Sequence, residues 1–123
     1  MIEFKNVSKV YDNGSVALDD VCLTINDGEF VLVCGHSGAG KSTLFKLLTH
    51  EVVPDAGTVI VDDFDVTRIK RSKIPKLRRK LGVVFQDFRL LPNKTVAENI
   101  AFALEVIEEK PKIIKEKVSH VLD

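Results

Sequence analysis

The chain has 123 residues, and its 18 Lys or Arg balance 18 Asp or Glu, so its formal net charge at pH 7 is zero. Hydrophobic residues make up 45% of the sequence, a globular value that argues against disorder. The charge balance gives no overall attraction to nucleic acid or to an anionic membrane. No apolar run approaches the roughly 20 residues of a membrane-spanning helix, and the first residues do not resemble a signal peptide. We therefore expect one cytoplasmic domain with a modest core.

The chain begins with a pattern that predicts two strands joined by a turn. Apolar and polar residues alternate over 2–10, with an irregularity expected near Asn6, and again over 16–25. Turn residues occupy 12–15 between them. The Asn-Asp-Gly at 26–28 predicts a hairpin into a third strand over 30–34, which is apolar on both faces like a buried parallel strand.

Two cysteines, Cys22 and Cys34, lie within these apolar runs. We expect two buried thiols in a reducing compartment. A disulfide or a metal pair is the alternative, and it would need further ligands nearby, of which the sequence shows none.

Residues 35–43, Gly-His-Ser-Gly-Ala-Gly-Lys-Ser-Thr, follow the predicted strand and precede apolar residues at helical spacing, which continue to about His50. A strand, this glycine-rich pattern and a helix together are typical of the phosphate-binding loop. Glycines let the backbone curl close to a ligand, so that its N–H groups and the helix N-terminus receive phosphate oxygens. The alternative is a glycine-rich turn before a capped helix. The predicted phosphate-binding residues are Gly35, His36, Ser37, Gly38, Ala39, Gly40, Lys41, Ser42 and Thr43.

Two of these residues carry specific chemistry. The ammonium group of Lys41 would reach the β- and γ-phosphates as a point charge. The hydroxyl of Ser42 is placed to ligate Mg²⁺, which prefers oxygen ligands and phosphates. The imidazole of His36 has no obvious catalytic partner in the sequence.

A turn at 54–57 and a strand over 58–62 are predicted next, followed by a basic run. Residues 68–80 include eight Lys or Arg and no acidic residue, and Pro75 opens a short helix with Leu77 facing inward. Nucleic acid or lipid headgroups could bind such a run. It has no interleaved aromatic residues for base stacking, and we favour a solvated face.

The rest of the chain predicts one more strand, a loop and two helices. Residues 81–85 form a second candidate for a buried strand, and the loop at 86–92 is unusually apolar. Thr95 and Glu98 match a capping box at the start of a helix that extends to about Ile107. Pro111 opens a final helix with an apolar stripe.

Four of these features together resemble an ATP-binding-cassette (ABC) ATPase. They are Tyr11 at the end of the first strand, the two-strand hairpin, the phosphate loop, and Gln86 in the run Gly-Val-Val-Phe-Gln-Asp. Within that superfamily, the runs at 35–40, 65–70, 77–79 and 85–91 resemble the FtsE family of bacterial cell-division ATP-binding proteins. Lipoprotein-release ATPases share many of these runs. Residues 49–53 depart from the family, which often has a glycine-containing turn there.

The resemblance implies an α/β P-loop fold with an N-terminal antiparallel β subdomain, and ATP with Mg²⁺ as cofactors. Tyr11 would stack on adenine. Gln86 would contact Mg²⁺ or position the attacking water. Lys41 and Gln86 are thus the candidate catalytic residues, and Ser42 and Gln86 the candidate Mg²⁺ ligands. An ordinary tyrosine at a strand edge and a solvated loop glutamine are the alternatives.

The resemblance also implies partners. The family's nucleotide-binding subunits form homodimers and work at the inner face of the cell membrane with an integral membrane partner, which would be FtsX-like here. No nucleic acid is implied. Phe88, Leu90 and Leu91 in the 86–92 loop would line the groove that receives a helix of that partner. Packing of this loop against the 95–107 helix is an equal alternative.

The resemblance covers residues 1–123 but only about the first half of the family's chain. The sequence has no apolar strand ending in Asp-Glu, which would supply a Mg²⁺ carboxylate and the general base, and no Leu-Ser-Gly-Gly signature. We expect the N-terminal part of a longer ATPase, which would not hydrolyse ATP alone. A non-hydrolysing nucleotide-binding module is the alternative.

The absent half also has a structural consequence. In the family's sheet, strands from the second half lie between the 30–34 and 82–85 strands. We therefore expect an incomplete core sheet, with strand pairing supplied by another chain or a local rearrangement.

Overall fold

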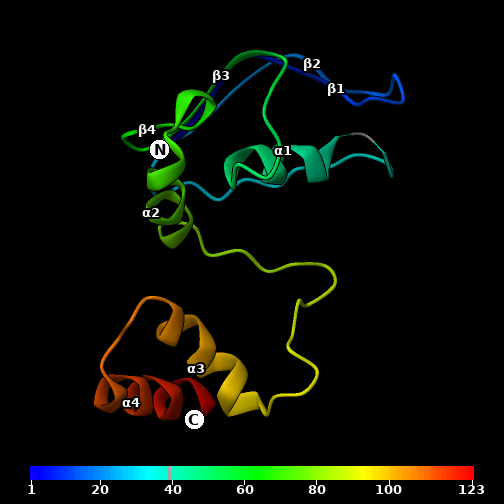
Figure 1. The fold of residues 1–123 in the computed structure, drawn as a ribbon. Coiled ribbons are helices and arrows are strands. Elements are labelled where there is room, and N and C mark those ends of the chain that lie inside the picture. Colours follow the sequence, from blue (N-terminus) through cyan, green and yellow to red (C-terminus); the bar gives the residue numbers. More distant parts are fainter. Residues whose placement is uncertain (39) are drawn as a thin grey trace. The chain divides into compact units, whose positions relative to one another are not determined.

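The computed structural model describes residues 1–38 and 40–123, which divide into two compact units, Met1–Gly82 and Val83–Asp123 (Figure 1). The first unit contains the sheet with its covering helices, and the second contains two helices and the loop before them. In the first unit the elements are β1 (Ile2–Val10), β2 (Val16–Ile25), α1 (Lys41–Leu48), β3 (Ala56–Val61), β4 (Phe64–Asp65), the 3₁₀ turns η1 (Val66–Arg68) and η2 (Arg71–Lys73), and α2 (Ile74–Arg79). In the second they are α3 (Val96–Val106) and α4 (Pro111–Leu122).

The sheet is antiparallel, with the strand order β2-β1-β3-β4. At its centre, Phe4 of β1 lies opposite Leu23 of β2 and Val59 of β3. The strands predicted over 2–10 and 16–25 are confirmed, and the alternation is visible in β2, where Val21, Leu23 and Ile25 are half-buried and Cys22 and Thr24 are exposed. The irregularity expected near Asn6 is also present: this residue has φ 48° and the register of β1 shifts after Phe4.

Strand β3 begins at Ala56, inside the stretch for which a turn was expected. Gly57 has φ +83° and lies across from the β1 irregularity, where a Cβ atom would come within 2.2 Å of the Asn6 carbonyl oxygen. A glycine is therefore required here for two reasons, a left-handed backbone and a close approach of two strands.

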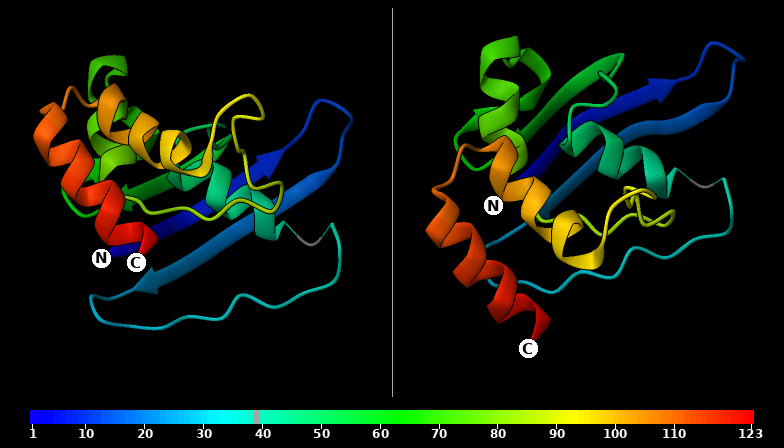
Figure 2. Two further views of the ribbon diagram at one scale, coloured as in Figure 1. Left: turned by 90° about the horizontal axis from the view of Figure 1, so that it is seen from below. Right: turned by 60° about the horizontal axis from the view of Figure 1, so that its bottom comes forward.

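Helix α1 lies against one face of the sheet (Figure 2). The core combines apolar side chains of three strands with side chains of α1, η1 and α2, because each element turns its apolar residues toward the same interior. Leu77 is fully buried, as predicted for the short helix that Pro75 opens. The buried apolar side chains are Phe4, Val7, Leu18, Leu47, Val59, Val61, Val66 and Leu77.

At the end of α1, where the sequence departs from the family's glycine-containing turn, the chain turns through His50. His50 adopts φ 54°, and its N–H donates to the Leu47 carbonyl at 3.1 Å while the Glu51 N–H donates to the Lys46 carbonyl at 2.8 Å. These two bonds form a Schellman motif, in which the left-handed position is usually a glycine. Arg78 of α2 donates through Nε to the neighbouring Thr49 carbonyl at 2.9 Å, which ties α2 to this helix end.

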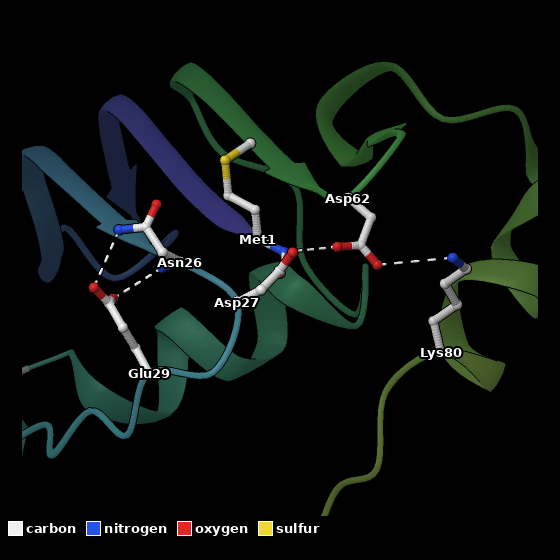
Figure 3. Close-up of polar contacts among 6 residues, drawn as sticks. All are labelled: Met1, Asn26, Asp27, Glu29, Asp62 and Lys80. Carbon is white, nitrogen blue, oxygen red and sulfur yellow. Dashed lines mark hydrogen bonds and ion pairs between the residues drawn. The ribbon is translucent and has the colours of Figure 1, made fainter.

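The start of β1 is held by two carboxylates (Figure 3). The Met1 ammonium donates to Asp27, in the turn after β2, and to Asp62, after β3, the latter at 2.7 Å. The bond to Asp27 is the main cause that raises the pKa of the ammonium, and the same ammonium lowers the pKa of Asp62. Lys80 lies 3.7 Å from Asp62, so the end of the basic run is neutralised in part.

In the second unit, the predicted capping box of α3 is confirmed. The Thr95 N–H donates to Glu98 Oε2 at 2.7 Å, and the Glu98 N–H donates to Thr95 Oγ1 at 3.2 Å. The bond from the Thr95 backbone lowers the pKa of Glu98. The helix that Pro111 was predicted to open is α4.

Two predicted strands are wrong. Residues 30–34 and 81–85 pair with no strand among the residues that the structure describes, and Phe30 and Val84 are 94% and 97% exposed. In Figure 2 the chain after β2 runs back to α1 without joining the sheet. An apolar run becomes a strand only when a neighbour takes up its backbone N–H and C=O groups. Within the described residues no rearranged sheet pairs these runs, and pairing with a strand of another chain stays a prediction.

The predicted burial of the cysteines is also wrong, since Cys22 and Cys34 are both exposed free thiols. Cys22 lies between the half-buried Val21 and Leu23, so the alternation of β2 places it on the outer face of the sheet. Cys34 belongs to the uncovered 30–34 run. Separately, among residues 1–38 and 40–123 no helix is both long and apolar enough to cross a membrane.

Candidate nucleotide site

The predicted phosphate loop leads directly into α1, with glycines where the backbone is left-handed. Gly38 and Gly40 have φ values of 82° and 85°, which β-carbon-bearing residues rarely adopt. Gly40 is the N-cap of α1, and its carbonyl accepts from the Thr43 N–H at 3.0 Å, the start of the helical pattern. Ala39, the remaining member of the predicted set in this turn, lies outside the described residues.

Lys41 is the first residue of α1, and its side chain turns back onto the loop. Its ammonium donates to the carbonyls of Gly35 and His36, the latter at 2.8 Å. The Lys41 ammonium therefore places one positive charge against the backbone of the phosphate loop. His36 takes part through its carbonyl, and its side chain is exposed. Ser42 is exposed at the first turn of α1, so its hydroxyl is accessible to a ligand.

The loop is backed by β2 of the sheet. A Cβ atom on Gly40 would lie 2.1 Å from the Ala17 carbonyl oxygen, so the loop and strand approach as closely as their backbones allow. Leu18, next to Ala17, and Leu47 of α1 share the core below this contact. The hairpin that precedes the phosphate loop thus positions it directly.

Tyr11, predicted to stack on adenine, lies at this same place. Its hydroxyl is 3.1 Å from Oγ1 of Thr43, a buried residue in the first turn of α1. The structure therefore brings the aromatic ring next to the end of the phosphate loop, although Tyr11 and Thr43 are 32 residues apart in the sequence.

Two residues that the sequence did not single out complete this environment. Lys9 Nζ lies 5.8 Å from the centroid of the Tyr11 ring, within the range of a cation–π contact. The same ammonium lies 3.5 Å from Asp55, whose other oxygen accepts from the Val10 N–H at 2.7 Å. That backbone bond is the main cause that lowers the pKa of Asp55. No sequence signal pointed to this pair, because their contact depends on the pairing of β1 with β3.

Gln86 and the apolar loop belong to the second unit. Gln86 is exposed, so its approach to Mg²⁺ or to the phosphate loop stays a prediction. Nearby, the Arg89 guanidinium lies 3.8 Å from the centroid of the Phe85 ring, and Phe88 and Arg89 both have positive φ values. The segment that carries Gln86 is therefore a defined bend.

The loop after this bend is tied to α3 by Asn99, a residue that the sequence patterns did not identify. Its side chain accepts from the Leu91 N–H at 2.7 Å and donates to the Leu91 carbonyl at 3.2 Å. Leu91 is half-buried, whereas Phe88 and Leu90 are exposed. An apolar groove of about 590 Å³ lies between this loop and α3, lined by Leu90, Leu91, Val96, Ile100, Phe102 and Ala103 among others. The Leu91 backbone is thus tied to α3, and the Leu90 side chain is exposed at the groove.

The residues present fit a nucleotide with Mg²⁺. Positive-φ glycines, an inward-facing ammonium and an accessible hydroxyl are the groups that hold phosphates, and the Tyr11 ring is suited to a base. No cluster of three or more His, Cys, Asp or Glu side chains that could hold a metal ion occurs among the residues outside position 39. The Ser42 hydroxyl would hold Mg²⁺ together with phosphate oxygens, as is usual for this ion, and a contact from Gln86 stays a prediction.

The fold and this site define the class of protein. Residues 18–123 match the ABC transporter family, and the chain belongs to that family. It has the partial α/β fold of a P-loop NTPase, an open antiparallel four-stranded sheet with helices.

Among curated relatives, the chain is similar to cell-division ATP-binding proteins. It is 54% identical over 123 residues to FtsE of Bacillus subtilis and 46% identical over 124 residues to FtsE of Mycobacterium tuberculosis. It is 42% identical over 125 residues to the methionine import ATP-binding protein MetN 1 of Bacillus thuringiensis. The matches cover 99–100% of this chain, 54% of each FtsE and 37% of MetN 1. The chain thus spans about half the length of the FtsE relatives.

Solved structures of ABC cassettes are similar to this chain. The ATP-binding cassette MJ0796, as a dimer in a post-hydrolysis state bound to ADP and Pi, matches with a TM-score of 0.86 and 33% identity over 98% of this chain and 55% of that one. CbiO1 from Clostridium perfringens, part of the ABC transporter complex cbiONQ, matches with a TM-score of 0.83 and 28% identity over 98% and 48% of the two chains.

Proposed function

We propose that this chain forms the N-terminal part, residues 1–123, of the nucleotide-binding domain of an ATP-binding subunit that acts in bacterial cell division. The observation that supports a nucleotide site is a pair of contacts at the start of α1. The Lys41 ammonium donates to a carbonyl of the phosphate loop, and the Tyr11 hydroxyl is hydrogen-bonded to Thr43 in the same helical turn. The assignment to cell division is supported by 46–54% identity to FtsE proteins.

In this proposal the residues have distinct tasks. The glycines of the loop and the N-terminus of α1 receive the phosphates, and Lys41 neutralises the β- and γ-phosphates. Ser42 contributes a hydroxyl to Mg²⁺, and Gln86 serves as the second contact to the ion or to the attacking water. The chain itself binds MgATP without hydrolysing it, because it has no general base following an apolar strand.

The whole protein would dimerise through its nucleotide-binding subunits and work at the inner face of the membrane. Its partner would be an FtsX-like integral membrane protein, received in part by the groove beside Leu90. The MJ0796 dimer supports the first element of this proposal by analogy. A subunit of an import system is the second candidate, favoured by the 42% identity to MetN 1.

Calorimetric titration of MgATP tests the site. We expect saturable binding, weakened by about 10- to 100-fold in Lys41→Ala, because a charge-assisted hydrogen bond contributes about 1.5–3 kcal/mol. Lys46→Ala, which removes an exposed ammonium from the same helix, is the matched control and should bind like the wild type. Equal MgATP affinity in Lys41→Ala would refute the phosphate site.

The choice between the two candidate systems needs a different experiment. We expect an FtsX-like membrane protein in detergent to retain the chain on an affinity resin, and Leu90→Asp to reduce that retention. Retention by the membrane subunit of a methionine importer, but not by the FtsX-like protein, would favour the second candidate.

A further inference from the structure

We propose that Thr43 is a positioning residue for a purine base. Its hydroxyl holds the Tyr11 ring beside the phosphate loop, while Lys9 covers one face of the ring and leaves the other face for stacking. This inference rests on the proposed nucleotide-binding function and specifies how the base part of that site is built.

The first argument is that Tyr11 is held at both ends. Its N–H donates to the Ser15 carbonyl at 2.9 Å and its carbonyl accepts from Gly14 at 2.8 Å, so the β1–β2 turn fixes its backbone. Its hydroxyl is 3.1 Å from Oγ1 of Thr43, which is only 5% exposed. A ring fixed at the backbone and at the phenol oxygen has lost most of its freedom before any ligand arrives, and a preorganised site binds more tightly.

The second argument concerns the faces of the ring. Lys9 Nζ lies 5.8 Å from the ring centroid and 3.5 Å from the Asp55 carboxylate, and the Lys9 side chain is only 16% exposed. A cation on one face leaves the opposite face for a base. It also draws electron density from the ring, which favours stacking with an electron-rich purine.

The third argument is that the Tyr11 ring and the phosphate loop are held at a fixed distance from each other. Thr43 is two residues after Lys41, in the same helical turn, so the bond to Tyr11 sets the distance between the ring and the phosphate-binding groups. The contact between Gly40 and the Ala17 carbonyl holds the loop against β2 independently. A nucleotide that spans ring and loop would therefore meet both at a fixed separation, and a bare polyphosphate would use only the loop.

The test is a double-mutant cycle with two ligands, MgATP and magnesium tripolyphosphate. We expect Tyr11→Phe and Thr43→Val each to raise the ratio of the MgATP Kd to the tripolyphosphate Kd about five-fold, because a ring that is no longer held must be ordered when the base binds. The double variant should raise this ratio no further, because both changes remove the same bond. Thr43→Ser keeps a hydroxyl and should restore the ratio. Thr24→Val, at an exposed threonine of β2, is the matched control.

A second readout reports on the ring directly. Tyr11 is the only tyrosine of the chain, so ring-labelled tyrosine gives one set of NMR signals. These signals should shift with MgATP by the ring current of a stacked base, and shift less with tripolyphosphate. In Thr43→Val, the signals of the ligand-free protein should already show a more mobile ring.

The outcomes separate the two proposals. If MgATP binds and depends on Lys41, but the cycle is additive or Tyr11→Phe and Thr43→Val leave the ratio unchanged, the positioning role of Thr43 is overturned and the phosphate site stands. If neither MgATP nor tripolyphosphate binds the wild-type chain, the proposed function fails and this inference fails with it.

Discussion

Single glycines show how closely backbones approach in this molecule. Gly28 and Gly57 have nearly the same left-handed conformation, with φ values of 78° and 83°. They differ in their surroundings, because a Cβ atom on Gly28 would meet nothing within 4 Å, whereas one on Gly57 would lie 2.2 Å from the Asn6 carbonyl oxygen. An alanine at Gly28 would therefore have only an unfavourable φ, whereas an alanine at Gly57 would have an unfavourable φ and a steric clash.

We predict that Gly28→Ala lowers the free energy of unfolding by about 1–2 kcal/mol, the cost of a left-handed alanine. Gly57→Ala should lower it by more than about 3 kcal/mol, because β1 and β3 must also move apart. Urea unfolding followed by circular dichroism measures both. Equal losses in the two variants would show that β3 accommodates the methyl group without separating from β1.

At the scale of elements, the predicted capping of α3 followed from local sequence, whereas two of the predicted strands did not form. Thr95 and Glu98 capped α3 where their spacing predicted, because both partners lie within one turn. The 30–34 run has the composition of a strand but lies outside the sheet, since strand formation needs a neighbour that local sequence cannot supply. The end of α1 is a third case, in which His50 occupies a position suited to glycine.

We predict that His50→Gly raises the free energy of unfolding by about 0.5–1 kcal/mol, because glycine adopts the left-handed conformation of the Schellman motif without a steric cost. The gain is smaller than that cost because glycine also has more freedom in the unfolded chain. His50→Ala, which keeps a Cβ atom, is the control and should not stabilise. Thermal unfolding at fixed pH checks this, and a lower midpoint for His50→Gly would contradict it.

Considered as a whole, the molecule exposes much apolar surface in extended backbone. Phe30 and Leu32 are 94% and 76% exposed, and their segment has no strand partner within the described part of the chain. Exposed apolar residues with unpaired backbone groups favour pairing between copies.

We therefore predict that the chain self-associates at micromolar concentrations, and that Phe30→Asp with Leu32→Asp suppresses this association without loss of the native circular dichroism spectrum. Sedimentation velocity measures the distribution of species. Val121→Asp replaces an exposed apolar residue of α4 and serves as the control, which should associate like the wild type. Identical sedimentation of the double variant and the wild type would show that the chains do not associate through the 30–34 segment.

Much of the candidate site could be predicted from sequence because its chemistry is local. The spacing of glycines, Lys41 and Ser42 before a helix predicts a phosphate loop, and nine consecutive residues carry this pattern. The capping box of α3, the start of α4 at Pro111 and the strands β1 and β2 with their irregularity near Asn6 were confirmed, because each was predicted from a pattern within a short stretch of sequence.

What only the tertiary structure decided are the contacts between distant segments. The bond between Tyr11 and Thr43, the Lys9 ammonium over the Tyr11 ring and the Gly57 contact with Asn6 all depend on how β1, β3 and α1 pack. Whether residues 30–34 and 81–85 form strands also depends on contacts with distant segments. Their apolar composition records a tendency to be buried, but burial and strand pairing require partner segments, and the residues described here supply none.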